Sequence, residues 1–217
     1  MPYFIHTASG KRFTYGSHDT EVLIEDVAKH LSCNARFSGA TKFHFSVGQH
    51  SVNVVPILRK VFGVSNPRTL LHGLLHDAHE YVMNDAPTPF QEWVRDEISG
   101  GVDFIEIAKS RLDAIIMPKL GVSWPPSKAD AEVVKLADKA AFVIEAGKLF
   151  HKVPDWLDGY KRRYNFPSNL ESIDIPVTPM LPSEAEHLFL KTYKELKDAI
   201  DAEIDNRAFE VPARSAV

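Results

Sequence analysis

Residues 66–89, NPRTLLHGLLHDAHEYVMNDAPTP, predict a buried helix that carries ionisable side chains. Four leucines recur at helical spacing after Pro67, which suits a first helical turn, and two prolines at the end of the stretch stop the helix. Buried imidazole and carboxylate groups are costly unless they are paired or bound to a metal. Because His76, Asp77 and Glu80 lie on one arc of this helix, the stretch indicates a site for acid–base or metal chemistry.

Apolar residues at helical spacing predict further helices on both sides of this stretch. Ser127 is a typical N-cap residue and begins a long one. The last helix is charged and amphipathic. The expected helices span residues 24–31, 47–62, 66–84, one or two segments of 90–119, 127–149 and 183–206.

The helices predict an all-α helical bundle that forms one domain, because no parallel-sheet pattern is present. Residues 1–20 are expected to form an extended N-terminal arm, for which a two-stranded ribbon is one possibility, and residues 20–150 the core. Five of the 14 prolines fall in residues 153–182, so that stretch is expected to be rich in loops. Residues 151–217 as a whole are expected to pack on the core through their helix and to end in a frayed tail at 208–217.

The composition limits the class of protein. The chain has 217 residues, of which 44% are hydrophobic and 25% charged, so it can bury a core and is not disordered throughout. A net charge of -4 argues against a stable nucleic-acid complex. Cys33 is the single cysteine, which excludes an internal disulfide and a cysteine-based zinc site. No signal peptide or membrane-spanning run is visible, so we expect a cytoplasmic protein with no membrane partner.

Two residues outside the opening stretch extend the cluster of candidate ligands. His50 lies in the preceding predicted helix, in the phrase FSVGQHS. Asp138 follows Leu136 and Ala137 directly, so it borders the apolar face of the long helix. Imidazole and carboxylate together form a mixed nitrogen and oxygen site that several divalent transition metals accept.

The order His50, then His76-Asp77, then Asp138 resembles the H…HD…D pattern of the HD-domain metal-dependent phosphohydrolases. The phrase HDAHEYVMNDAPTP is similar to the HDxxExxxxDxPTP signature of the 5'-deoxynucleotidase branch. Residues 33–51, CNARFSGATKFHFSVGQHS, and 136–146, LADKAAFVIEA, resemble segments of small phage phosphohydrolases, among them a dATP triphosphohydrolase. The resemblance covers residues 20–150 and implies the HD-domain helical bundle.

The resemblance also implies roles for the ionisable residues. His50, His76, Asp77 and Asp138 would bind one divalent transition metal, with zinc, cobalt or manganese expected, and an additional magnesium could accompany the phosphates. Glu80 would be the catalytic residue that handles the proton of water or of the leaving oxygen.

Further residues are candidates for substrate binding. Asp85 would accept a hydrogen bond from the sugar 3'-hydroxyl, and the guanidinium of Arg36 would hold phosphate. Phe37 is a candidate for stacking on the base or sugar, with core packing as the alternative. The other candidates are Lys42, Lys135 and, as a phosphate contact or a partner of the ligands, His79.

The expected function is hydrolysis of deoxynucleotides at the α-phosphorus, with dATP favoured as the substrate and deoxyadenosine and triphosphate as the products. One alternative is a 5'-deoxynucleotidase that acts on deoxynucleoside monophosphates. Another is a noncatalytic nucleotide-binding module, and a third is cyclic-nucleotide or alarmone hydrolysis. We expect a homo-oligomer, and a host-cytoplasm location if the chain is encoded by a phage.

Overall fold

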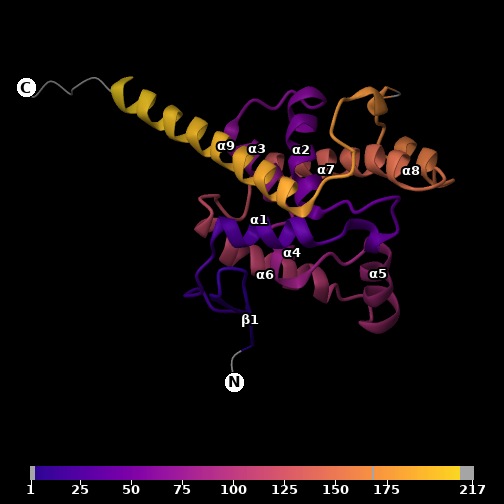
Figure 1. The fold of residues 1–217 in the computed structure, drawn as a ribbon, viewed down its shortest axis with the longest axis horizontal. Helices are drawn as coiled ribbons and strands as arrows, with labels where there is room; N and C mark the ends of the chain where they lie inside the picture. The colour runs from indigo at the N-terminus through magenta and orange to yellow at the C-terminus, as the bar shows by residue number, and fades with distance from the viewer. Residues whose placement is uncertain (1–2, 168, 211–217) are drawn as a thin grey trace, which may run out of the picture.

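The centre of the protein consists of three helices that pack against one another: α2 (Val47–Lys60), α3 (Pro67–Leu74) and α7 (Lys128–Leu149). The computed structural model describes residues 3–167 and 169–210, and Figure 1 shows that helices joined by loops are the main element of this part. The only sheet among the described residues is a two-stranded antiparallel ribbon. The prediction of an all-α fold is therefore confirmed.

Short polar side chains determine where the main helices begin. Ser46, Asn66 and Ser127 accept hydrogen bonds from backbone N–H groups in the first turns of α2, α3 and α7. Asp103 does the same for α6 (Phe104–Lys119). These bonds satisfy donors that a helix otherwise leaves unpaired, so the caps specify the ends of the elements that carry the candidate site.

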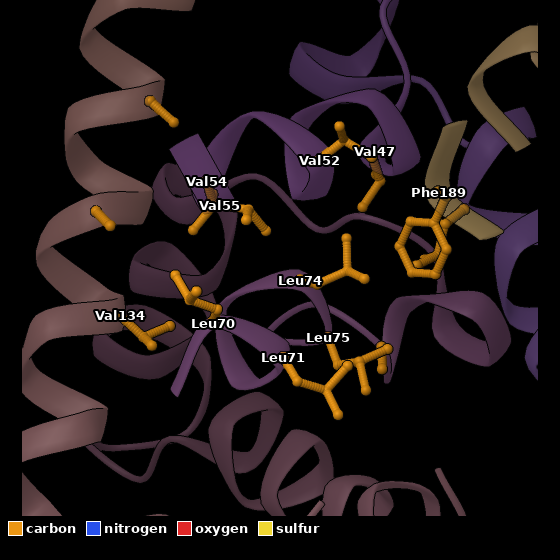
Figure 2. Packing of buried hydrophobic residues seen from close by; sticks show 14 of the residues in the cluster. Val47, Val52, Val54, Val55, Leu70, Leu71, Leu74, Leu75, Val134 and Phe189 are labelled. Carbon is orange, nitrogen blue, oxygen red and sulfur yellow. The ribbon is translucent and has the colours of Figure 1, made fainter. Parts of the chain in front are cut away.

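The core is apolar and includes the last helix of the chain. Figure 2 shows the leucines of α3 beside the valines of α2, with Val134 and Phe189 on either side. Phe189 belongs to α9 (Pro182–Glu210), which packs on α1 (Ile24–Cys33), α2 and α3. The C-terminal helix thus contributes side chains to the core.

The helix predicted over residues 66–84 is wrong in one respect, because the structure divides it. α3 ends at Leu74, residues 75–79 form a turn, and α4 (Glu80–Met83) follows. The turn contains i→i+3 hydrogen bonds, such as the one from the Glu80 N–H to the Asp77 carbonyl at 2.9 Å. Side chains three residues apart eclipse one another in such a turn, so Asp77 and Glu80 lie on the same side.

The N-terminal arm does form a ribbon, from β1 (Phe4–His6) and β2 (Arg12–Thr14). Phe13 is fully buried in the core, and the Tyr15 hydroxyl donates to the Val82 carbonyl, so the arm is fastened to the body. No helix within the described residues has both the length and the apolar character that crossing a bilayer requires.

The remaining segments differ in detail from the prediction. Residues 90–119 contain the end of α5 (Thr88–Trp93), a π-helical turn (Val94–Ile98) and α6. The loop-rich stretch holds α8 (Leu157–Arg163) and a 3-10 turn (Leu170–Ser172). The last helix extends to Glu210, so the predicted tail begins too early, and residues 211–217 lie outside the described part of the chain.

Candidate metal centre

Four predicted ligands converge at one point from three separate segments of the chain. His50 Nε2 lies 3.3 Å from His76 Nε2 and 3.1 Å from Asp138 Oδ1. His76 Nε2 lies 3.1 Å from Asp77 Oδ2 and 3.8 Å from Asp138 Oδ1. The His50 side chain is 0% exposed and the Asp138 side chain 34% exposed, so the cluster opens towards solvent on the side of α7.

The spacing and chemistry of these four groups fit a bound metal ion. Metal–ligand bonds of about 2.0–2.2 Å place neighbouring ligand atoms ~3–3.6 Å apart in octahedral or tetrahedral coordination. The closest approaches in the cluster, between 3.1 and 3.3 Å, fall in that range. The structure therefore contains a buried histidine and aspartate cluster that can hold a metal, while the identity of the ion does not follow from it.

The orientation of both imidazole rings is determined by hydrogen bonds on the opposite nitrogen. His76 Nδ1 donates to the Gly73 carbonyl at 2.9 Å, and a carbonyl can only accept. His50 Nδ1 lies 3.0 Å from both carboxylate oxygens of Glu145. Each ring therefore directs Nε2 into the cluster, and that nitrogen can bind a metal once the metal displaces its proton.

The two carboxylates of the cluster stay ionised at neutral pH. Burial opposes their charge, but the neighbouring histidines outweigh it and hold the pKa values of Asp77 and Asp138 below the ordinary range. Ionised carboxylates are the form that binds a metal. Burial lowers the pKa values of His50 and His76, but the neighbouring carboxylates outweigh it and raise them, so a metal would compete with protons for these two rings.

Glu145 was not predicted, although it supports the centre directly. It is fully buried on α7, contacts His50, and lies 3.5 Å from both the side-chain amide of Asn53 and Arg36 Nε. One signal was present in the sequence: a single carboxylate interrupts the buried run Val143–Ala146, two helical turns after Asp138.

Arg36 lies at the edge of the cluster, as the prediction required. Its Nη1 is 3.6 Å from Asp77 Oδ2. Burial opposes its charge, but Glu145 and Asp77 outweigh that effect and raise the pKa of the guanidinium. It begins a 3-10 turn (Arg36–Gly39) in which Phe37 and Ser38 have φ values of 55° and 51°, so the backbone is left-handed there.

The Phe37 ring packs against other aromatic rings next to this turn. Its centroid lies 5.6 Å from that of Phe142 and 5.2 Å from that of Phe150. Phe142 stacks in turn on Trp156 at 5.5 Å with an interplanar angle of 16°. Phe37 is therefore a packing residue in this structure, in line with the alternative of core packing, and stacking on a base stays a prediction.

Glu80 faces the cluster from the first turn of α4. It is 4% exposed, and its Oε2 has no hydrogen-bond partner among the described residues. Burial, with the neighbouring carboxylates of Asp77 and Asp85, raises the pKa of Glu80 well above its ordinary value. A buried carboxyl without a partner is costly, which is typical of a functional group.

Asp85 and His79 complete the polar surroundings. Burial raises the pKa of Asp85, whereas Arg36 lowers it, so the two groups lie within electrostatic reach of each other. His79 Nδ1 lies 3.1 and 3.2 Å from the two carboxylate oxygens of Asp113 on α6. Asp113 is a second buried carboxylate that was not predicted.

The two lysine candidates do not join the cluster. Lys42 Nζ donates to the Lys148 carbonyl near the end of α7, about 15 Å along the helix from Asp138. Lys135 is exposed one turn before Asp138. Lys109 is a cation that was not predicted. Its charge partly offsets the rise in the pKa values of Glu80 and Asp85, and its Nζ donates a hydrogen bond to Gln91 Oε1 at 2.9 Å.

Comparisons with known proteins give relatives without an assigned activity. No protein-family model matches the chain. The chain is 28% identical over 200 residues to the uncharacterized protein YfdR of Escherichia coli, and the match covers 90% of this chain and 96% of YfdR. It is 30% identical over 135 residues to an uncharacterized protein of Rhodobacter capsulatus, covering 59% of this chain and 63% of that protein. Any function must therefore be argued from the site itself.

Proposed function

We propose that this protein is a metal-dependent phosphohydrolase that cleaves deoxynucleotides at the α-phosphorus, with dATP as the favoured substrate. The observation that carries the proposal is the convergence of His50, His76, Asp77 and Asp138 at spacings that fit a metal, beside a guanidinium and a partnerless carboxyl group. The resemblance of the motifs to HD-domain phosphohydrolases supports the same reading.

A divalent metal held by these four residues would lower the pKa of water and polarise the phosphorus centre. Arg36 is placed to bind phosphate oxygens, since its guanidinium borders Asp77 and carries donors beyond the two that face carboxylates. The reaction adds the oxygen of water to the α-phosphorus and breaks its bond to the sugar 5'-oxygen. Glu80, whose raised pKa favours its protonated form, gives its proton to the leaving 5'-oxygen and regains one from the attacking water.

Asp85 is the proposed contact of the sugar. It follows Asn84, whose φ of 63° turns the chain after α4, and the charge of Arg36 partly offsets the rise that burial causes in the pKa of Asp85. A carboxylate there can accept a hydrogen bond from the 3'-hydroxyl. The substrate would then lie with its phosphate at the cluster and its sugar towards α5.

The test is product release from a panel of deoxy- and ribonucleoside mono- and triphosphates, with protein that has been stripped and reloaded with zinc, cobalt or manganese. Asp77→Ala serves as the inactive blank and Asp158→Ala, an exposed carboxylate on α8, as the matched control. We expect deoxyadenosine and triphosphate from dATP with the wild type and the control. Turnover of monophosphates alone would assign a 5'-deoxynucleotidase instead. No turnover by fully metal-loaded protein would contradict the proposal and favour a nucleotide-binding module.

A further inference from the structure

A second group of metal-ligand atoms lies directly beside the first. Asp77, His79 and Glu80 each offer one ligand atom within 4.8 Å of the other two. Asp77 and His79 lie in the turn that separates α3 from α4, and Glu80 is the first residue of α4. The hydrogen bond from the Glu80 N–H to the Asp77 carbonyl brings Asp77 and Glu80 together. Asp77 thus belongs to both groups.

His79 is oriented in the same manner as His50. The carboxylate of Asp113 accepts a hydrogen bond from Nδ1, so Nε2 carries the lone pair. His79 is 5% exposed, and its Nε2 has no partner among the described residues. A carboxylate behind a histidine is the arrangement that commonly supports metal ligands.

The local charge favours a cation at this position. Glu80 Oε2 is the second buried atom without a partner in the group. Asp77, Glu80 and Asp85 crowd together, and Arg36 is already engaged by Asp77 and Glu145. One cation would satisfy both partnerless atoms and would add to the partial offset of the carboxylate charges that Arg36 and Lys109 provide.

We propose that Asp77, His79 and Glu80 bind a second divalent cation, with the Asp77 carboxylate bridging it to the first. Two carboxylates and one imidazole suit manganese or magnesium. Pairs of ions of this kind clamp the oxygens of a reacting phosphate. The inference rests on the proposed function for the first ion, and it adds a role for Glu80: one carboxylate oxygen binds the ion while the other handles the proton.

The experiment counts manganese ions bound per chain. Chelator-treated full-length protein is dialysed against increasing Mn²⁺, bound metal is measured, and electron paramagnetic resonance detects coupling between neighbouring ions. We expect two ions and a coupled signal in the wild type, and one ion without coupling in His79→Ala. Asp113→Asn should keep two ions but bind the second about 10–100-fold more weakly.

The matched control is His72→Gln. His72 is also a buried histidine of α3, but its Nε2 faces the Ser123 carbonyl at 3.1 Å rather than the cluster, so this variant should keep both ions. If His79→Ala does not fold by circular dichroism, Glu80→Gln replaces it. One ion in the saturated wild type, or two coupled ions in His79→Ala, would overturn the inference.

The count also separates this inference from the proposed function. If the saturated protein holds only one ion and still hydrolyses nucleotides, the second site is contradicted and the phosphohydrolase proposal is supported. Two coupled ions without turnover of any nucleotide would support the second site and contradict the phosphohydrolase.

Discussion

At the scale of single residues, a carboxylate outside the four proposed ligands supports the candidate centre. Glu145 is the clearest case, because it is fully buried and its main partner is the imidazole of His50. It accepts the Nδ1 proton and so keeps Nε2 free as a ligand. Its negative charge also raises the basicity of that ligand.

We expect Glu145→Gln to weaken the binding of Zn²⁺ or Mn²⁺ about 10–100-fold, because an amide of the same shape removes the charge behind His50. The measurement is a metal titration of chelator-treated protein. Glu132→Gln, an exposed position on the same helix, is the control and should bind as the wild type does. Equal affinity of Glu145→Gln and the wild type would show that Glu145 serves packing alone.

At the scale of elements, close approach between helices positions the ligands. A Cβ atom at Gly48 of α2 would lie 2.7 Å from Ser32 Oγ and 3.1 Å from the Ser32 backbone nitrogen in α1. The side chain of Ser32 can rotate away, but its backbone cannot. Only glycine therefore lets α1 and α2 approach this closely, two residues before the ligand His50.

We expect Gly48→Ala to lower the free energy of unfolding by about 1–3 kcal/mol through overpacking, although alanine is the better helix former. Gly159→Ala on α8 is the matched control, because nothing lies within 4 Å of its added Cβ atom. It should stabilise the protein by about 0.5–1 kcal/mol. The measurement is the free energy of unfolding of both variants in urea. A Gly48→Ala protein more stable than the wild type would refute the close-packing argument.

A second prediction at this scale concerns the start of α7. The Asp130 carboxylate accepts hydrogen bonds from Ser127 and from Thr69 of α3, and these bonds lower the pKa of Asp130 below 3.8. A lowered pKa in the folded state means stability that is present at neutral pH and lost as the pH falls through that pKa. Asp130→Asn should therefore destabilise the protein by about 1 kcal/mol near neutral pH.

The difference in melting temperature between Asp130→Asn and the wild type should shrink as the pH is lowered from about 6 to about 2. Glu132→Gln removes a charge two residues further along α7 that makes none of these hydrogen bonds, and it controls for net charge. A difference that stays constant over this range would show that the charge of Asp130 is not what links α3 to α7.

The elements also show why only part of the structure could be predicted. Caps such as Asn66 and Ser127 and the leucine spacing of α3 are local signals, so the helices that carry them were predicted. The break after Leu74 has no such signal, because the apolar pattern continues through it. Glu145 and Asp113 were missed because their partners lie 95 and 34 residues away, and such pairings depend on how the helices pack.

At the scale of the whole molecule, the cluster joins α2, the turn after α3 and α7, so a bound metal should stabilise the entire fold. At a free metal concentration about 100 times the dissociation constant, binding contributes about 2.7 kcal/mol. For a chain of this size that corresponds to an increase of about 5–10 °C in melting temperature.

The measurement is thermal unfolding of chelator-treated protein with and without added Zn²⁺ or Mn²⁺. His76→Ala should show no increase, since it lacks one ligand. An equal increase in wild type and His76→Ala would place the stabilising ion elsewhere on the surface.

The packing of α9 on α1, α2 and α3 has a consequence for how the chain matures on the ribosome. Phe189, Leu196 and Ile200 complete the core, yet they are made after every proposed metal ligand. At about 5–20 residues per second, translation from Asp138 to Ile200 lasts ~3–12 s. During that interval the apolar side chains of α1, α2 and α3 lack the cover that α9 gives them in the folded protein, so the core cannot close until the last helix emerges.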